Sequence, residues 1–235
     1  MKKLFILSLL LFFSFPLVAK TKNLVFNKSY DCSLIESLEI SLTYEDLKIS
    51  QIYGDEITIE ISSNNNLLVP SVMLAQNDEE LTSCLKIKSE VTKTKPGNNC
   101  TVYVYIPQDF IADNMVISLV SGNLQADFLR SENSLSVNNV SGRTDIAGLS
   151  TDFLNLSSVS GNIKTQKLSV SYFNISNISG NIFIELDKPM LAKSMLSSIT
   201  GKIQVYYKKN ESPFTDDSPE FIISTISGKI EKVAY

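Results

Sequence analysis

Residues 173–184 read Phe173-Asn174-Ile175-Ser176-Asn177-Ile178-Ser179-Gly180-Asn181-Ile182-Phe183-Ile184, and this stretch is one copy of a unit that recurs along the chain. An aliphatic residue, a hydroxyl residue and a glycine follow one another in Val120-Ser121-Gly122, Val140-Ser141-Gly142, Val159-Ser160-Gly161, Ile178-Ser179-Gly180, Ile199-Thr200-Gly201 and Ile226-Ser227-Gly228. The steps from glycine to glycine are 20, 19, 19, 21 and 27 residues. A nearly constant period of this length indicates a protein built from stacked coils.

Apolar residues keep fixed places around each of these glycines. They lie seven, five and two residues before it and two and four residues after it, which for Gly180 are Phe173, Ile175, Ile178, Ile182 and Ile184. The spacings of two place each pair on one face of a strand. The step of three between Ile175 and Ile178 breaks this alternation, and it predicts a corner between two strands of each coil.

The corner has an alternative interpretation as a hairpin turn. Glycine can adopt a positive φ without a steric penalty, which suits a corner, but Ser-Gly and Gly-Asn are also tight-turn dipeptides. A hairpin centred on Ser179-Gly180 would pair Ile175 with Ile184. It would also set Ile178 opposite Asn181 on the other face, whereas stacked coils place identical positions above one another.

We therefore predict an all-β fold, a parallel β-solenoid or β-helix of roughly 19–21-residue coils. Ile175 and Ile184 are expected to point into its core, and Gly180 to hold a corner conformation that excludes β-branched residues. The expected organisation is a signal peptide at 1–19, an N-terminal β portion with the first coil and a hairpin at 20–110, and the repeat-bearing solenoid at 111–235, the last two forming one continuous domain.

The first residues have the pattern of a targeting segment. Lys2 and Lys3 precede an apolar run at 4–17, and the small residue Ala19 follows it. We expect cleavage after Ala19 and export to the periplasm or the cell surface, with a retained N-terminal anchor as the alternative. No later segment is apolar over the length that a transmembrane helix needs, so none is expected after removal of the signal.

The N-terminal β portion carries a weaker form of the repeat. Leu47, Ile49 and Ile52 lie seven, five and two residues before Gly54, so we expect the first coil to begin there. An alternating strand at 57–61, a loop-rich insertion or short helix at 62–83, and a strand ended by Pro107 are expected to follow. The turn residues at 95–99 predict a hairpin between 85–91 and 101–106.

Charge excludes nucleic acid as the partner. Without the two lysines of the signal, the chain has 19 basic and 25 acidic groups and a net charge of −6. Arg130 and Arg143 are its two arginines, and no basic cluster occurs. A surface that neutralises phosphates needs many Lys or Arg side chains on one face.

Three cysteines in an exported chain allow one disulfide. Cys84 with Cys100 is the first choice, because the bridge closes a loop of 15 residues and is worth about 3 kcal/mol in loop entropy. The predicted hairpin does not place these two sulfurs opposite each other, so Cys32 remains a partner for either. The sequence has no C-x-x-C motif and no histidine, which predicts neither a metal site nor a cofactor.

Catalysis is the less favoured function. β-Solenoids host polysaccharide lyases and hydrolases, which need a base or a pair of carboxylates at a set separation. No acidic residue recurs at the same place in adjacent units, and no histidine is present to activate the repeated serines. We expect no catalytic residues, and we interpret the serines as corner residues.

The candidate binding residues form a column one place after each glycine. They are expected to stack and to face outward as an extended polar strip. A structural ladder without a partner is the equal alternative. The members are Asn123, Arg143, Asn162, Asn181 and Lys202.

The order of these motifs resembles the bacterial putative adhesin family of head GIN type, a domain of otherwise unknown function. The resemblance rests on Leu47 to Gly54, on Gly-Asp-Glu-Ile at 54–57, on Val-Tyr-Ile-Pro at 104–107 and on the successive Ser-Gly-Asn-Ile units. It covers nearly the whole chain after residue 19, and it implies a β-solenoid exported to the cell envelope. Related toast-rack domains belong to envelope-stress signalling proteins.

Two non-catalytic functions therefore stand side by side. One is an adhesin-like binding or scaffolding module whose partner is an envelope protein or a glycan. The other is an accessory domain for envelope-stress sensing or signalling, and a polysaccharide-acting β-helix enzyme is a more distant alternative.

Overall fold

The computed structural model describes residues 23–64, 69–77, 82–89, 99–187, 194–208 and 221–235. These residues form strands, short turns and one 3-10 turn, η1 (Cys32–Leu34). None of the described helices is long and apolar enough to cross a membrane. The expected signal peptide at 1–19 lies outside the described residues.

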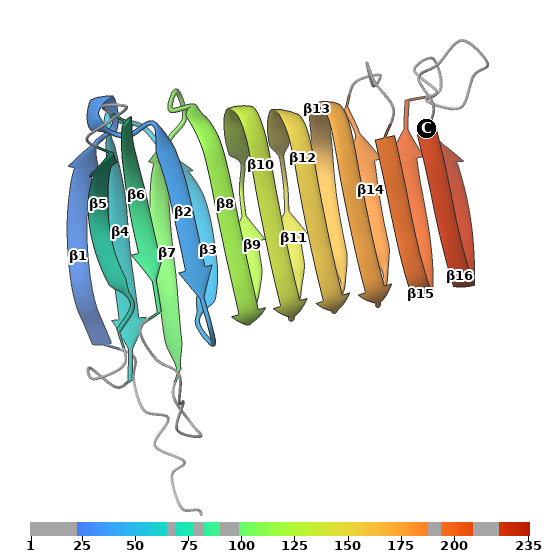
Figure 1. The fold of residues 1–235 in the computed structure, drawn as a ribbon, viewed down its shortest axis with the longest axis horizontal. Helices are drawn as coiled ribbons and strands as arrows, with labels where there is room; N and C mark the ends of the chain where they lie inside the picture. Colours follow the sequence, from blue (N-terminus) through green and yellow to red (C-terminus); the bar gives the residue numbers. More distant parts are fainter. Residues whose placement is uncertain (1–22, 65–68, 78–81, 90–98, 188–193, 209–220) are drawn as a thin grey trace, which may run out of the picture.

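The repeat region winds as stacked coils, seen side by side in Figure 1. Each coil contributes one extended segment to a first layer and one to an opposite second layer, and the chain turns from the first to the second at the glycine. The strands are β8 (Ala112–Ser121), β9 (Leu124–Ala126), β10 (Leu129–Ser141), β11 (Thr144–Ile146), β12 (Leu149–Ser160), β13 (Ile163–Ser179), β14 (Ile182–Leu186), β15 (Ser194–Tyr207) and β16 (Phe221–Ala234). β13 begins in the second layer and ends in the first layer of the next coil, and β15 and β16 each run through the corner from the first layer into the second.

Neighbouring coils pair in parallel and in register. Leu154 lies between Leu135 of β10 and Phe173 of β13, so equal places of the repeat lie side by side. In the second layer, Ile163 of β13 lies beside Thr144 of β11 and Ile182 of β14 in the same way. A meander of hairpins would give antiparallel pairs here, so the prediction of a parallel, solenoid-like all-β fold is confirmed.

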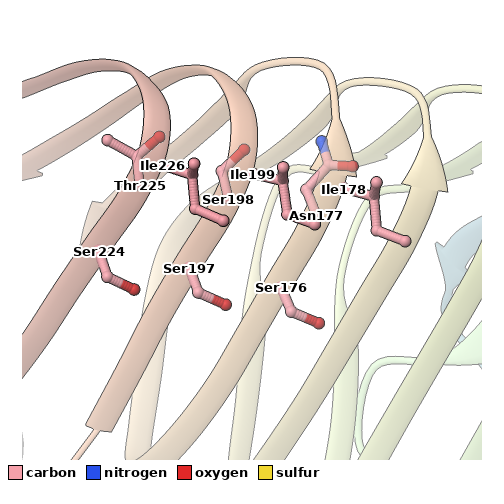
Figure 2. Close-up of a pocket in the computed structure, with 9 residues that line it drawn as sticks. All are labelled: Ser176, Asn177, Ile178, Ser197, Ser198, Ile199, Ser224, Thr225 and Ile226. Carbon is pink, nitrogen blue, oxygen red and sulfur yellow. The ribbon is translucent and has the colours of Figure 1, made fainter.

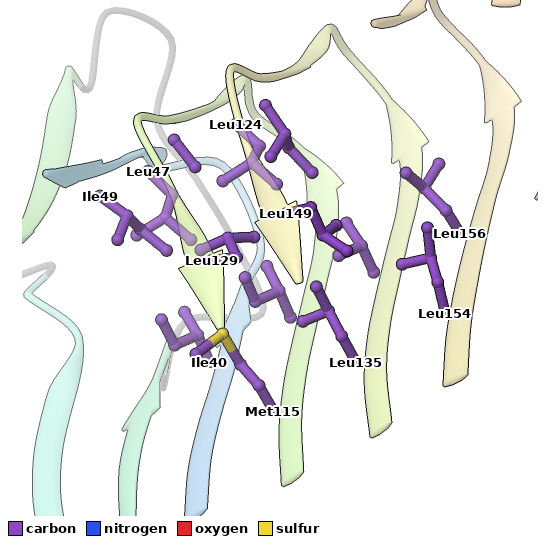
Figure 3. Packing of buried hydrophobic residues seen from close by; sticks show 14 of the residues in the cluster. Ile40, Leu47, Ile49, Met115, Leu124, Leu129, Leu135, Leu149, Leu154 and Leu156 are labelled. Atoms are coloured by element: carbon purple, nitrogen blue, oxygen red, sulfur yellow. The ribbon is translucent and has the colours of Figure 1, made fainter. Parts of the chain in front are cut away.

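The core is a continuous set of aliphatic side chains between the two layers (Figure 3). Ile175 and Ile184 are both fully buried, as predicted. Leu129 and Leu149 lie beyond the second-layer strands and close the opposite edge of the core. Each side chain of this size stabilises the fold by about 1.5–3 kcal/mol when it is fully buried.

Gly180 shows why glycine recurs at the corner. Its φ is +124°, and a Cβ placed on it would collide with the carbonyl oxygen of Gly161 in the preceding coil. The position therefore excludes every side chain and not only the β-branched ones that the sequence indicated.

The first coil begins earlier than the sequence pattern predicted. In β2 (Ser37–Leu42), Leu38 pairs with Met115, and in β3 (Asp46–Ile52), Leu47 pairs with Leu124. Leu47 thus holds the place two residues after the corner and not the place seven before it. The expected register, with Gly54 at the corner of this coil, is wrong because Glu45 occupies that corner.

Glu45 supports its corner with hydrogen bonds that a glycine cannot make. The side chain is buried, and its Oε2 accepts from the backbone N–H of Thr43 at 2.9 Å, from that of Tyr44 at 2.9 Å and from the hydroxyl of Ser89 at 2.7 Å. The carboxylate thereby satisfies partly buried donors at a turn that lacks the Ser-Gly sequence.

The N-terminal end of the stack is closed by antiparallel strands. β1 (Asn23–Asp31) pairs with β4 (Glu56–Ser63), which pairs with β7 (Cys100–Pro107), and β5 (Ser71–Asn77) pairs with β6 (Thr82–Lys88). β6 and β7 form one more coil beside β2 and β3. The predicted hairpin between them is wrong because they lie in different layers, and the described part of 62–83 is strand and not helix.

The placement of β6 and β7 in different layers also separates the two cysteines that were expected to form a disulfide. Cys84 is a free cysteine on β6 in the first layer, whereas Cys100 lies buried on β7 in the second layer. Burial raises the pKa of the Cys84 thiol, which keeps it protonated. The expected bridge between Cys84 and Cys100 is absent, and Cys32 is also a free cysteine.

We expect Ile175→Asp to destabilise the fold by about 2–5 kcal/mol, because it buries an unpaired carboxylate. Ile178→Asp is the matched control, since this isoleucine lies in the same strand but is 47% exposed, and its cost should stay within about 0.5 kcal/mol. Urea unfolding followed by circular dichroism measures both. Equal losses in the two variants would contradict the assigned register.

Candidate functional site

The five residues predicted as a binding strip do form one column on the outside of the second layer. Each lies one place after a corner and precedes a buried residue of the second-layer strand. Asn123, Arg143, Asn162 and Asn181 are exposed and Lys202 is partly exposed. The structure extends the column to Asp46, which the sequence pattern missed because its corner has no glycine.

Side-chain oxygens link this column from coil to coil. Oδ1 of Asn162 accepts from the backbone N–H of Asn181 at 2.9 Å, and Oδ1 of Asn181 accepts from that of Lys202 at 2.9 Å. Asn123 accepts in the same way from Arg143 at 3.0 Å, and Asp46 accepts from Asn123 at 2.9 Å. The asparagine oxygens therefore have a structural task. The column's cations are engaged as well, because Arg143 pairs with Asp145 and Lys202 pairs with Glu231.

A second outward column lies two residues further along the same strands. Its members pair in register across the second layer, so they form one row along the molecule, and the sequence analysis did not identify them. In spatial order they are Tyr103, Lys48, Gln125, Asp145, Lys164, Phe183, Gln204 and Glu231. We call this row, together with the column from Asn123 to Lys202, the second-layer face.

Two lysines of the second-layer face each lie beside an aromatic ring of the neighbouring strand. Nζ of Lys48 lies 5.8 Å from the ring centre of Tyr103, and Nζ of Lys164 lies 5.9 Å from that of Phe183. The Phe183 ring packs against Tyr206 with 4.7 Å between the ring centres. Such contacts hold a cation over a π face while leaving it open to an anionic or hydroxyl-bearing group.

Two shallow hollows meet on this face. One of about 300 Å³ is lined by Lys48, Ile49, Ser50, Tyr103, Tyr105, Gln125 and Asp127. The other, of about 310 Å³, is lined by Asn123, Leu124, Gln125, Arg143 and Asp145. Gln125 belongs to both hollows. The column from Asn123 to Lys202 and the row from Tyr103 to Glu231 therefore share one continuous surface.

The electrostatics of these hollows favour binding over proton transfer. Burial and the nearby Glu60 raise the pKa of Tyr105, whose hydroxyl donates to Glu60 Oε2 at 3.2 Å. A phenol held in its neutral form is a hydrogen-bond donor and not a base. In the part of the chain that the structure describes, no three His, Cys, Asp or Glu residues are grouped so that they could hold a metal ion.

The residues two places before each glycine form a different surface. The sequence pattern grouped them with the core positions, but their side chains lie outside on the corner between the layers, 43–48% exposed in five coils and 82% exposed at Ile226. At the C-terminal end they border a groove of about 340 Å³, shown in Figure 2 and lined by Ser176, Asn177, Ile178, Ser197, Ser198, Ile199, Ser224, Thr225 and Ile226.

Comparison with known proteins identifies the class of all-β domain to which these stacked coils belong. The family described as Toastrack DUF4097 matches residues 35–218, so the chain belongs to the Toastrack family. The expected relation to toast-rack domains is thereby confirmed, whereas the head GIN type stays a prediction. No curated protein matches the chain.

Two solved structures share the fold at low identity. A "putative cell adhesion protein" from Clostridium sporogenes is 13% identical with a TM-score of 0.52, covering 90% of this chain and 98% of the other. A "putative adhesin" from Bacteroides fragilis is 14% identical with a TM-score of 0.51, covering 91% and 99%. At this identity the likeness shows the fold alone.

Asn181→Ala should lower the free energy of unfolding by about 1 kcal/mol, because the backbone N–H of Lys202 loses its acceptor. Asn181→Asp keeps an acceptor oxygen and should lose less. Denaturant titration of both variants provides the measurement. No loss in Asn181→Ala would mean that this hydrogen bond contributes no stability, and equal losses in both variants would mean that the acceptor oxygen is not the cause.

The last coil should show a pH dependence that Glu231 controls. Hydrogen bonds from Lys202 and Lys229 lower the pKa of Glu231 from 4.5 to about 2. Because the folded pKa lies below the unfolded value, the ion pairs stabilise the coil fully above pH 4.5 and lose this effect as pH falls toward about 2. Glu231→Gln should flatten the melting temperature between these limits, and an unchanged profile would contradict the assignment.

Proposed function

We propose that the protein is an exported, non-catalytic, adhesin-like module that binds a partner in the cell envelope or on a facing surface through its second-layer face. The observation that carries this proposal is the in-register row of lysines, aromatic rings, amides and carboxylates beside the asparagine column. The row repeats across coils and includes no deep cleft. Such a surface suits many weak contacts made at once.

The chemistry of the face favours a partner that is polar and partly anionic. Lys48 and Lys164 contact rings and have no carboxylate partner in the described residues, whereas Asp145 and Glu231 are neutralised by Arg143 and by Lys202 with Lys229. The two lysines therefore offer unpaired positive charge on a protein that is acidic overall. Aromatic rings beside them can pack on the apolar faces of sugars or side chains.

A pull-down from envelope extract and host-surface glycans tests the proposal. The double variant Lys48→Ala/Lys164→Ala should lose most of the captured material, while Lys28→Ala, whose ammonium lies over Tyr30 on the distant β1, should retain it. Capture that survives the double variant would remove this face from consideration. Turnover of any captured polysaccharide would overturn the non-catalytic function, and a single membrane signalling protein as the captured partner would favour the sensing alternative.

Export makes a separate prediction. If the segment 1–19 is a signal peptide, the protein secreted from its host will have the mass of the chain that begins at Lys20. Intact-mass spectrometry of the envelope fraction measures this directly. A mass that retains Met1 to Ala19 would show that the segment is kept as an anchor.

A further inference from the structure

Three parallel columns of outward side chains run along the corner between the two layers. The central one is the exposed aliphatic column, Val120, Val140, Val159, Ile178, Ile199 and Ile226. The polar column two residues before it contains Ser118, Asn138, Ser157, Ser176, Ser197 and Ser224. The polar column directly after it contains Ser121, Ser141, Ser160, Ser179, Thr200 and Ser227. We call the three columns together the corner strip.

No residue of the corner strip is charged, although 20% of the whole chain is. The corner itself does not require this, since one place after the glycine the same coils carry Arg143 and Lys202. A surface that excludes charge in every coil suits a neutral ligand, because a charged group brought there would lose water without gaining a counter-charge.

Most hydroxyls of the corner strip have no protein partner. Within the described residues, Thr200 donates to the carbonyl of Ile178 at 3.2 Å, and Ser157 donates to Asn138 at 2.6 Å. The other serine hydroxyls of the two polar columns make no hydrogen bond to protein there, among them Ser176, Ser197 and Ser224 along the groove in Figure 2. They line both sides of an apolar column with unused donors and acceptors.

We propose that the corner strip binds a linear, neutral polysaccharide that runs along the solenoid, one sugar to about one coil. A sugar ring presents apolar C–H faces and hydroxyl edges, which match the aliphatic column and the two hydroxyl columns. Neighbouring strands are about 4.8 Å apart, so six coils offer a track of about 24 Å. This advance per coil is close to that of one pyranose unit in an extended chain.

Other occupants fit the strip less well. An acyl chain would cover the flanking hydroxyls without pairing them, which costs free energy. A peptide that adds as a strand needs unpaired backbone groups at a sheet edge, whereas the strip runs across the strands and its backbone in β12 and β13 is paired with both neighbouring coils. The proposal is independent of the second-layer face, because the two surfaces share no residue.

Titration of the full chain with linear gluco-, manno- and galacto-oligosaccharides of increasing length tests the proposal, with oligogalacturonate as the charged comparison. At least one neutral series should bind more tightly with each added sugar, and the charged chain should bind more weakly. Amide shifts observed by NMR should be confined to the corner strip and its backbone.

Variants at the centre of the groove make the test specific. Ile199→Ser should weaken binding of the longest neutral oligomer by about five- to tenfold, and Ser197→Val should also weaken it. Ile199→Val should leave affinity within about twofold because it keeps the apolar contact. Lys28→Ala, on β1 and outside both proposed surfaces, should leave it unchanged, and equal melting temperatures verify that all variants are folded.

Several results would overturn the proposal. They are the absence of binding to every neutral series, an affinity that does not depend on length, and an Ile199→Ser variant that binds as well as the parent. Ile199-dependent binding to phosphatidylcholine vesicles would assign the strip to acyl chains instead. Ile199-dependent dimerisation in sedimentation would assign it to a second copy of the chain.

Discussion

The structure depends on the close approach of successive corners. The glycine of one coil lies directly against the carbonyl oxygen of the glycine before it, as at Gly161 with Gly142 and at Gly180 with Gly161. No Cβ fits between the two corners, so the later corner must be a glycine. At the first coil the earlier corner is Glu45, which presents its backbone carbonyl to Gly122. Inward amides complete this contact, since Nδ2 of Asn177 donates to the Gly161 carbonyl at 2.8 Å.

The register of the corner glycines also sets the alignment of all other equivalent positions in the repeat. Once two glycines are in register, residues at equal places in the repeat lie about 4.8 Å apart in neighbouring strands. Inward places then become continuous aliphatic ladders, and outward places become rows of like side chains. The asparagine column shows how one such row acquires a structural task, because each amide oxygen satisfies the backbone of the next coil.

Both proposed binding sites are therefore extended surfaces along the stack. The second-layer face concentrates charges and rings, whereas the corner strip excludes charge and presents hydroxyls around an aliphatic column. The free thiol of Cys84 and the neutral phenol of Tyr105 belong to neither a nucleophilic nor an acid–base arrangement. On both proposals, binding strength comes from repeated contacts, which a coil-by-coil architecture supplies.

The sequence by itself determined the coil, its corner and the burial of Ile175 and Ile184, because a local period of apolar residues and glycines leaves few ways to pack strands. It also placed the column from Asn123 to Lys202 on one line, since equal places in a repeat must stack. Only the tertiary structure decided the register of Leu47, the separation of Cys84 from Cys100 and the exposure of Ile178. Strand partners distant in the chain are chosen by the packing of the whole stack, and apolar spacing alone does not say which side of a bent strand faces water.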